Sequence, residues 1–248
     1  MAVKNTIANR PKQMPDKAIE YKVGDETVKL SPSIIRNYLV SGNGQVTDQE
    51  VAMFLNLCRY QHLNPFLREA YLIKFGNQAA TMVVGKDAIT KRAFKNPRFA
   101  GMEAGVVVQH ENTGELEYRP GALVLDGEQL VGGWAKVHVK EYNVPIEAVA
   151  SFREYVGLTR DGEINGQWSK KPATMIRKVA LTQALREAFP EDLGGLYASE
   201  EMNVDIDETA MAPVNVVEQP ETTVMPEVIE EPQPEPQPAT IDDIGGLF

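Results

Sequence analysis

Apolar and polar residues near the start of the chain follow the spacing of two amphipathic helices. The first is predicted over residues 31–40, because its opening serine is a favoured helix cap and the proline after it suits a first helical turn. In the second, Thr47 and Glu50 form a capping box, and the apolar residues that follow recur at helical spacing to about Gln61. Both helices therefore have a start signal as well as an apolar face.

The spacing then changes to the alternation that is typical of strands. Residues 69–75 and 79–84 predict a β-hairpin, and a helix is predicted over residues 86–94, directly after Gly85. Further short strands, separated by turn residues, are predicted at residues 103–110, 115–119, 122–125, 129–139 and 146–152. The pair Gly132-Gly133 lies inside one of these strands and indicates either a bulge or a close approach of two backbones.

The rest of the chain predicts a loop, one more helix and a tail. Residues 153–169 are expected to form the loop, and Pro172 begins a helix that runs to about Phe189. Beyond that helix Pro, Glu, Gln, Val and Thr dominate, and the Pro-rich run at 232–238 is incompatible with a helix or an interior strand. The predicted parts are an extended, lysine-dotted N-terminal arm at 1–30, a folded core at 31–201 and a disordered acidic tail at 202–248.

The charges of the chain are unevenly distributed. The formal net charge is −10, yet residues 1–190 carry all 25 Lys and Arg against 20 of the 35 Asp and Glu, which leaves this part at +5. The 15 remaining acids lie in residues 191–248. A basic body is the electrostatic footprint of a protein that binds polyanions, and the acidic tail conceals it in the overall charge.

Features of several other protein classes are absent from the sequence. The first residues have no apolar signal-peptide core, and no apolar run approaches the ~20 residues of a membrane-spanning helix, so we expect a soluble intracellular protein without a membrane partner. The single cysteine, Cys58, lies in an apolar helical pattern and is expected to be a buried, unreactive thiol. There is no nucleotide-binding loop or nucleophile motif, and the three histidines are far apart, so neither a cofactor nor a metal is expected.

Two clusters of basic residues are the positive evidence for polyanion binding. The first has a net charge of +4 over thirteen residues and consists of Lys86, Lys91, Arg92, Lys95 and Arg98, opposed only by Asp87. The second consists of Lys170, Lys171, Arg177, Lys178 and Arg186. On a helical projection the cations of residues 171–178 share one side, and the opposite side carries the apolar residues Ile176, Val179 and Ala180. A single basic helix face is also typical of an ordinary helix exposed to solvent. The prediction of polyanion binding therefore depends on the presence of two basic clusters, whose Lys and Arg side chains would contact phosphates.

Two blocks of motifs follow one another between residues 50 and 200. The first block consists of Leu63-Asn64-Pro65-Phe66, Glu69-x-Tyr71 and Val83-Val84-Gly85. The second block consists of Asn165-Gly166-x-Trp168, Met175-Ile176-Arg177-Lys178-x-Ala180 and Phe189-Pro190. In order and spacing they resemble the phage RecT/Redβ family of single-strand annealing proteins, and most of all its RecT branch from prophages. The chain departs from the pattern at Ala88, where a glycine is usual.

The resemblance implies an ATP-independent recombinase, not an enzyme, that coats single-stranded DNA and anneals it to a complementary strand in the cytoplasm of a bacterial host. It implies homo-oligomeric rings or filaments in which adjacent subunits form a continuous basic groove for the strand and the annealed duplex. It also implies a phage exonuclease as a partner. The implied fold is α+β, with a β-hairpin and a short antiparallel sheet packed on a long helix.

Carried over by motif, Arg177 and Lys178 are the strongest candidates for phosphate contacts, and the helix after Gly85 supplies a second basic wall. Met175 and Trp168 correspond to framing residues. The indole of Trp168 also suits stacking on bases, so a packing role and a stacking role both stay open for it.

The last eight residues differ from the rest of the tail. Asp242, Asp243 and Phe248 resemble the acidic tip of bacterial single-strand binding proteins, in which a terminal Phe enters an apolar pocket. Such a tip would recruit host single-strand-binding or repair proteins, or compete for the basic groove of the chain itself, and salt would screen both effects. A solubilising role is the simplest alternative.

Two other functions stay open from the sequence. A single-strand binding protein with an OB barrel would protect a strand without promoting annealing, although a five-stranded barrel does not require the motif at 175–180. A Mg²⁺-dependent nuclease would have to bring together scattered carboxylates such as Glu69, Asp87 and Glu103.

Overall fold

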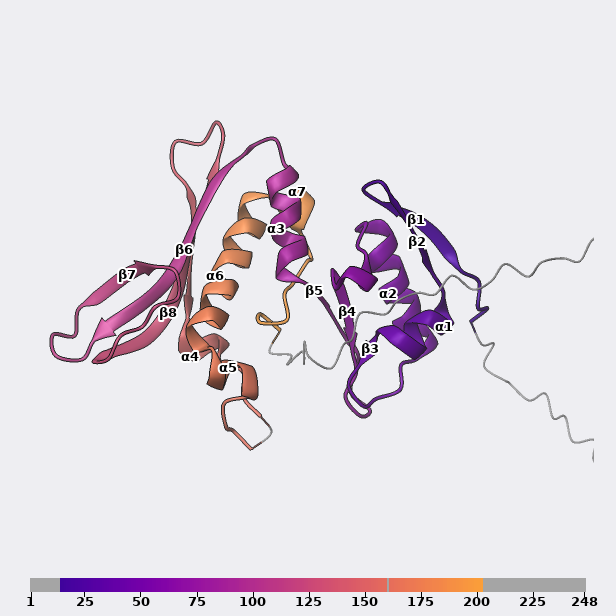
Figure 1. Cartoon of the computed structure of the whole chain (residues 1–248), viewed down its shortest axis with the longest axis horizontal. Helices are drawn as coiled ribbons and strands as arrows, with labels where there is room; N and C mark the ends of the chain where they lie inside the picture. Colours follow the sequence, from indigo (N-terminus) through magenta and orange to yellow (C-terminus); the bar gives the residue numbers. More distant parts are fainter. Residues whose placement is uncertain (1–13, 160, 203–248) are drawn as a thin grey trace, which may run out of the picture. The chain divides into compact units, whose positions relative to one another are not determined.

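The structure, a computed structural model, describes residues 14–159 and 161–202 and has a mixed α+β fold (Figure 1). Its strands are β1 (Ile19–Val23), β2 (Glu26–Leu30), β3 (Val40–Ser41), β4 (Ala70–Ile73), β5 (Thr81–Val84), β6 (Phe99–His110), β7 (Leu116–Pro120), β8 (Glu128–Val139) and β9 (Ile146–Ser151). Its helices are α1 (Pro32–Ile34), α2 (Asp48–Tyr60), α3 (Lys86–Lys95), α4 (Phe152–Tyr155), α5 (Gly166–Lys170), α6 (Pro172–Ala188) and α7 (Pro190–Leu193), with a π-helical turn η1 (Ile35–Leu39) and a 3-10 turn η2 (Pro65–Leu67). The α+β class that the sequence predicted is confirmed.

Strands β1 and β2 form an antiparallel hairpin where the sequence predicted an extended arm. The turn contains Gly24, whose φ of 62° lies in the left-handed region that glycine adopts without strain. Tyr21, Val28 and Leu30 of this hairpin are buried in the hydrophobic core. The prediction for residues 19–30 was wrong because each strand is short and its exposed face carries the charged residues that suggested an arm.

The first long helix begins as its capping box predicts. Thr47 Oγ1 accepts a hydrogen bond from the Glu50 amide at 3.2 Å, and Glu50 Oε2 accepts one from the Thr47 amide at 2.8 Å. The other carboxylate oxygen of Glu50 accepts a hydrogen bond from Lys74 Nζ at 2.6 Å. One side chain therefore caps α2 and also ties it to the residue that follows β4.

The smaller sheets lie in the first part of the chain. The predicted hairpin over residues 69–84 is confirmed as the antiparallel pair β4 and β5, and β3 adds to β4 in parallel orientation. The larger sheet is antiparallel with the strand order β7–β6–β8–β9. The strand predicted at 122–125 was wrong, because these residues belong to the connection between β7 and β8. The predicted loop at 153–169 contains the short helices α4 and α5, and Asn165 caps α5 by accepting a hydrogen bond from the Trp168 amide at 3.1 Å.

The two adjacent glycines of β8 both lie in close backbone contacts, Gly133 with α6 and Gly132 with β9. A Cβ on Gly133 would lie 2.5 Å from the carbonyl oxygen of Ile176 in α6, and a Cβ on Gly132 would lie 2.6 Å from the carbonyl oxygen of Ala150 in β9. The register between β6 and β8 also shifts next to Gly132. Both predicted features, a bulge and a close backbone approach, therefore occur at this pair of glycines.

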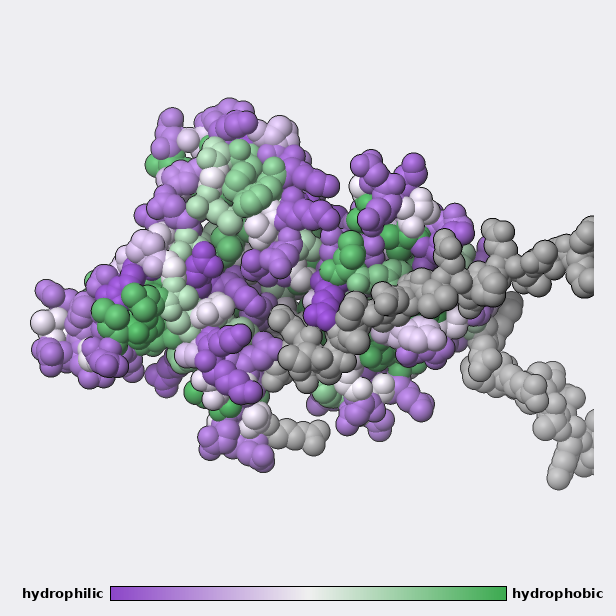
Figure 2. All heavy atoms as spheres, in the orientation of Figure 1, coloured by the Kyte–Doolittle hydropathy of each residue, from purple (hydrophilic) through white to green (hydrophobic). Residues whose placement is uncertain are grey.

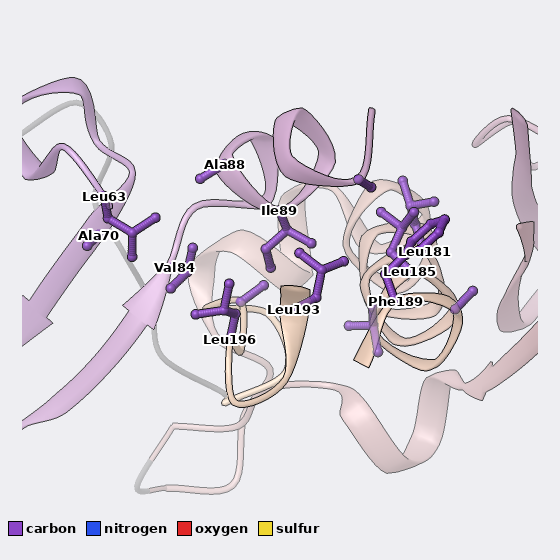
Figure 3. Packing of buried hydrophobic residues seen from close by; sticks show 14 of the residues in the cluster. Leu63, Ala70, Val84, Ala88, Ile89, Leu181, Leu185, Phe189, Leu193 and Leu196 are labelled. Atoms are coloured by element: carbon purple, nitrogen blue, oxygen red, sulfur yellow. The ribbon is translucent and has the colours of Figure 1, made fainter. Parts of the chain in front are cut away.

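Helix α6 supplies much of the core. Ile176, Val179 and Ala180 are fully buried, as the helical projection predicted. Figure 3 shows that the next turns of α6 continue this packing toward α3, α7 and the segment after α7; its labelled residues are Leu63, Ala70, Val84, Ala88, Ile89, Leu181, Leu185, Phe189, Leu193 and Leu196. The same core cluster therefore includes residues of β4, β5, α3 and α6.

The face drawn in Figure 2 is mainly hydrophilic, with separate apolar patches. Within residues 14–159 and 161–202, no helix combines the length and the apolar character that crossing a membrane requires.

Candidate nucleic-acid interface

The first motif block builds a rigid turn before β4. Asn64 Oδ1 caps the 3-10 turn η2 by accepting a hydrogen bond from the Phe66 amide at 3.0 Å. The Glu69 carboxylate accepts a hydrogen bond from the Asn64 amide at 2.8 Å. Between them Arg68 adopts a left-handed conformation with a φ of 60°. The turn therefore fixes the positions of one cation and one buried carboxylate.

Gly85 links this turn to the start of α3. A Cβ at position 85 would lie 2.6 Å from the carbonyl oxygen of Arg68, which a side chain could not tolerate without moving the backbone. The Gly85 amide donates a hydrogen bond to the Glu69 carbonyl at 3.1 Å. This close approach places Lys86 and Lys91 of α3 beside the turn. Ala88 is buried in the core.

A cavity of about 450 Å³ lies where these elements meet α6 and the segment after α7. Its lining residues are Leu67, Arg68, Glu69, Tyr71, Gly85, Lys86, Asp87, Ala88, Lys91, Lys178, Ser199 and Glu200. The lining combines four cationic side chains with three carboxylates. It brings together residues of both predicted basic clusters, and the nearest of these in the sequence, Lys91 and Lys178, are 87 positions apart.

Ion pairs organise the charges of this cavity. Lys86 Nζ lies 2.6 Å from Asp87, Lys91 Nζ lies 2.8 Å from Glu69, and Lys178 Nζ lies 2.8 Å from Glu200. The carboxylates of Glu69 and Glu200 are nearly inaccessible, whereas Asp87 is almost fully exposed. A phosphate at this cavity would therefore have to compete with these carboxylates for the ammonium groups, and salt would weaken its contacts.

The remaining cations of the first cluster do not line the cavity. Arg92 donates hydrogen bonds to the side-chain oxygen of Gln61 at 2.6 Å and to the Asp192 carbonyl at 3.1 Å, and burial lowers the pKa of its guanidinium. Arg98 pairs with Glu141 at 3.0 Å, and Lys95 is exposed near the end of α3. The cations of the first cluster therefore have different surroundings, since Lys86 and Lys91 line the cavity and the other three do not.

The cations of the second cluster also have different surroundings. Lys170 and Lys171 are exposed where α5 meets α6. Arg177 is half-buried, and its Nε donates a hydrogen bond to the Ala104 carbonyl in β6 at 3.2 Å. Arg186 forms two hydrogen bonds with Glu201. Within this cluster Lys178 is the cation that lines the cavity.

The two framing candidates are both buried. Trp168 is 2% exposed, and its ring lies 5.8 Å from that of Phe152 in an edge-on arrangement. Met175 is buried in the first turn of α6. The buried indole of Trp168 presents no stacking surface in this structure, which favours the packing role of the two left open by the sequence.

Two charged residues of the cavity, Arg68 and Glu200, were not predicted from the sequence. Arg68 lies between two quoted motifs, and its position could have been inferred from them. Glu200 has no local signal, because its role depends on the long-range contact with Lys178. The tail candidates Asp242, Asp243 and Phe248 lie outside the described residues.

The carboxylates suggested for Mg²⁺ do not gather at one point. Glu69 and Asp87 line the cavity, whereas Glu103 is paired with His138 at 3.1 Å. In the part of the chain that the structure describes, a different trio of potential ligands comes together, namely His110, Glu117 and Glu128. The Arg119 guanidinium already bonds to both of these glutamates, so a cation is present there without a metal.

Comparison with known proteins gives a family and one curated relative. The model of the RecT family matches residues 26–214, which include every residue of the cavity. The chain is also 28% identical over 149 residues to "Uncharacterized protein UU154" of Ureaplasma parvum serovar 3, a match that covers 60% of this chain and 55% of that protein. The chain thus spans about half the length of this relative. Because the family match covers most of the chain and contains both motif blocks, the protein belongs to the RecT family.

Proposed function

We propose that the protein binds single-stranded DNA and anneals complementary strands without ATP, and that the cavity between α3, α6 and the β4–β5 hairpin is part of its DNA path. The family membership supports phage single-strand annealing recombination. The observation that carries the proposal is the convergence of Lys86, Lys91 and Lys178 on one cavity. These lysines come from the two separate basic clusters, so the fold brings cations from distant parts of the chain to one cavity.

The physical requirements of annealing agree with this site. Pairing two strands releases on the order of 1.4 kcal/mol per base-pair step, so no nucleotide hydrolysis is needed. The protein has to neutralise the repulsion between two phosphate chains and raise their local concentration. Lysine side chains perform the first task, and many weak contacts along one strand perform the second.

The proposal extends to assembly and partners. In it, copies of the chain form a ring or filament whose individual cavities join into one basic groove, with Arg177 and the exposed Lys95, Arg98, Lys170 and Lys171 extending it between copies. A phage exonuclease supplies the single strand in the cytoplasm of the host. The tail residues Asp242, Asp243 and Phe248 recruit host single-strand-binding or repair proteins.

Gel-shift assays with sequentially added oligonucleotides test the proposal directly. One labelled strand is added to the full chain without ATP, followed by either its complement or an unrelated strand. We expect weak retention of the first strand and much tighter retention of the annealed product. Equal retention with the unrelated strand would contradict annealing.

The same assay distinguishes an annealing protein from the alternative, an OB-type single-strand binding protein. That protein would hold the first strand tightly, and adding the complement would not produce duplex faster. The sheets of the described residues have two, three and four strands, which gives no support to a five-stranded barrel. A strand that is shortened only when Mg²⁺ is present would reveal the nuclease alternative instead.

A further inference from the structure

The segment after α7 brings an acidic side chain into the candidate DNA path. Leu196 and Ala198 are buried and anchor the segment, and Figure 3 shows Leu196 beside Val84 and Leu193. The Val84 amide of β5 donates a hydrogen bond to the Tyr197 carbonyl at 2.9 Å. Directly after this anchor, Ser199 and Glu200 line the cavity.

Glu200 is held differently from the other carboxylates of the cavity. Glu69 is fixed by a backbone amide, and Asp87 is 93% exposed, so solvent screens it. The carboxylate of Glu200 is buried, yet the contacts described for it are with two side chains, Lys178 Nζ at 2.8 Å and Ser199 Oγ at 3.1 Å. A rotation of its side chain would break the ion pair between Glu200 and Lys178 without moving the buried anchor.

The neighbouring Glu201, unlike Glu200, has a structural role. Glu201 binds Arg186 through both carboxylate oxygens, at 2.5 and 3.1 Å, and accepts a hydrogen bond from the Ala198 amide at 3.0 Å. The Arg186 guanidinium also lies 4.5 Å from the centre of the Tyr197 ring. Glu201 therefore holds the segment in place while Glu200 faces the cavity.

We propose that Glu200 is a built-in counter-ion that competes with a DNA phosphate for Lys178 and so lowers the affinity of the site for single strands. This inference rests on the proposed DNA-binding function and adds a regulatory element to it. A single phosphate displaces the carboxylate poorly, because it exchanges one ion pair for another. A strand that presents several phosphates at once displaces it readily, since its other contacts keep it in place. The site thereby favours long strands over small anions.

Fluorescence anisotropy with a labelled single-stranded oligonucleotide tests the inference on the full chain. Glu200→Gln is expected to tighten binding by about fivefold, the upper end for one partly exposed ion pair. It should also steepen the plot of log Kd against log salt by about 0.7, the value for one added phosphate contact on a single strand. The matched control is Glu111→Gln, which removes the same charge from an exposed turn outside the cavity and should leave both quantities unchanged.

A double-mutant cycle with Lys178→Gln shows whether the effect passes through Lys178. The inference predicts that Glu200→Gln has no effect in the Lys178→Gln background, and a retained gain would overturn it. Glu200→Asp, whose shorter side chain keeps the charge, should give an intermediate gain and serves if the first variant is unstable.

The failure of each idea has a different signature. If Lys178→Gln weakens binding but Glu200→Gln behaves like Glu111→Gln, the counter-ion role is wrong and the DNA site stands. If Lys178→Gln binds as well as Lys29→Gln, a control on an exposed lysine of β2, the proposed DNA site itself is wrong.

Discussion

Gly133→Ala should damage the fold at the contact between β8 and α6. The added Cβ would lie 2.5 Å from the Ile176 carbonyl oxygen, 2.8 Å from its carbonyl carbon and 3.1 Å from the Arg177 amide nitrogen. All three atoms belong to the backbone of α6, so no side-chain rotation relieves the overlap. Overpacking of this kind costs about 1–3 kcal/mol, which corresponds to a Tm roughly 2–12 °C lower for a domain of this size.

The two tryptophans of the chain provide the assay. Trp134 is the residue after Gly133, and Trp168 lies in α5, which contacts α6; both are buried. Guanidinium unfolding followed by tryptophan fluorescence should show a lower midpoint for Gly133→Ala, together with a changed emission spectrum of the folded state.

Gly76→Ala is the matched control. Gly76 has a φ of 51° and no atom within 4 Å of its added Cβ, so its cost is the left-handed conformation alone, about 1–2 kcal/mol. This variant should lose stability without changing the folded-state spectrum. An unchanged midpoint and spectrum for Gly133→Ala would refute the reasoning that α6 and β8 require a glycine between them.

Three further predictions follow from individual contacts. Thr47→Ala removes the cap of α2 and should lower the free energy of unfolding, measured in urea, by about 1 kcal/mol. Thr47→Ser keeps the hydroxyl and should retain most of the wild-type stability. Equal stability of the two variants would contradict the capping role. Burial raises the pKa of the Cys58 thiol to about 12. A thiol reagent near pH 8 should therefore label the unfolded chain and not the native protein. Rapid labelling of the native protein would show that the thiol is accessible. Hydrogen bonds from Arg119 and the Leu125 amide lower the pKa of Glu128 from 4.5 to about 2. The carboxylate therefore contributes fully to the free energy of unfolding above about pH 5, and this contribution is lost as the pH falls toward 2. Glu128→Gln should therefore flatten the loss of stability over that range, and an unchanged pH profile would show that this carboxylate does not contribute.

The parts of the fold that the sequence predicted are those with strong local signals. The capping box at Thr47, the hairpin before Gly85 and the long apolar face of α6 each depend on residues within a few positions of one another. The hairpin at 19–30 was missed because its strands are short and half-exposed, and the connection at 122–125 was mistaken for a strand because it is apolar without being paired.

For the candidate site, the sequence indicated which basic residues to consider but not what their side chains contact. The two basic clusters contain the lysines that line the cavity, but helical spacing does not reveal that Arg92 turns toward Gln61 or that Arg177 bonds to Ala104. Such contacts depend on which elements meet in three dimensions. The role of Glu200 is the clearest example, since its partner lies 22 residues away and on another element.

The central claim is that Lys86, Lys91 and Lys178 together shield the repulsion between two DNA strands while they pair. The most direct measurement is the rate at which two dye-labelled complementary strands anneal without ATP in the presence of the triple Lys→Gln variant, compared with Lys29→Gln. The account predicts that the triple variant, with native tryptophan fluorescence, anneals about tenfold more slowly or worse, as expected for three partly exposed ion contacts. Annealing as fast as with Lys29→Gln would contradict it.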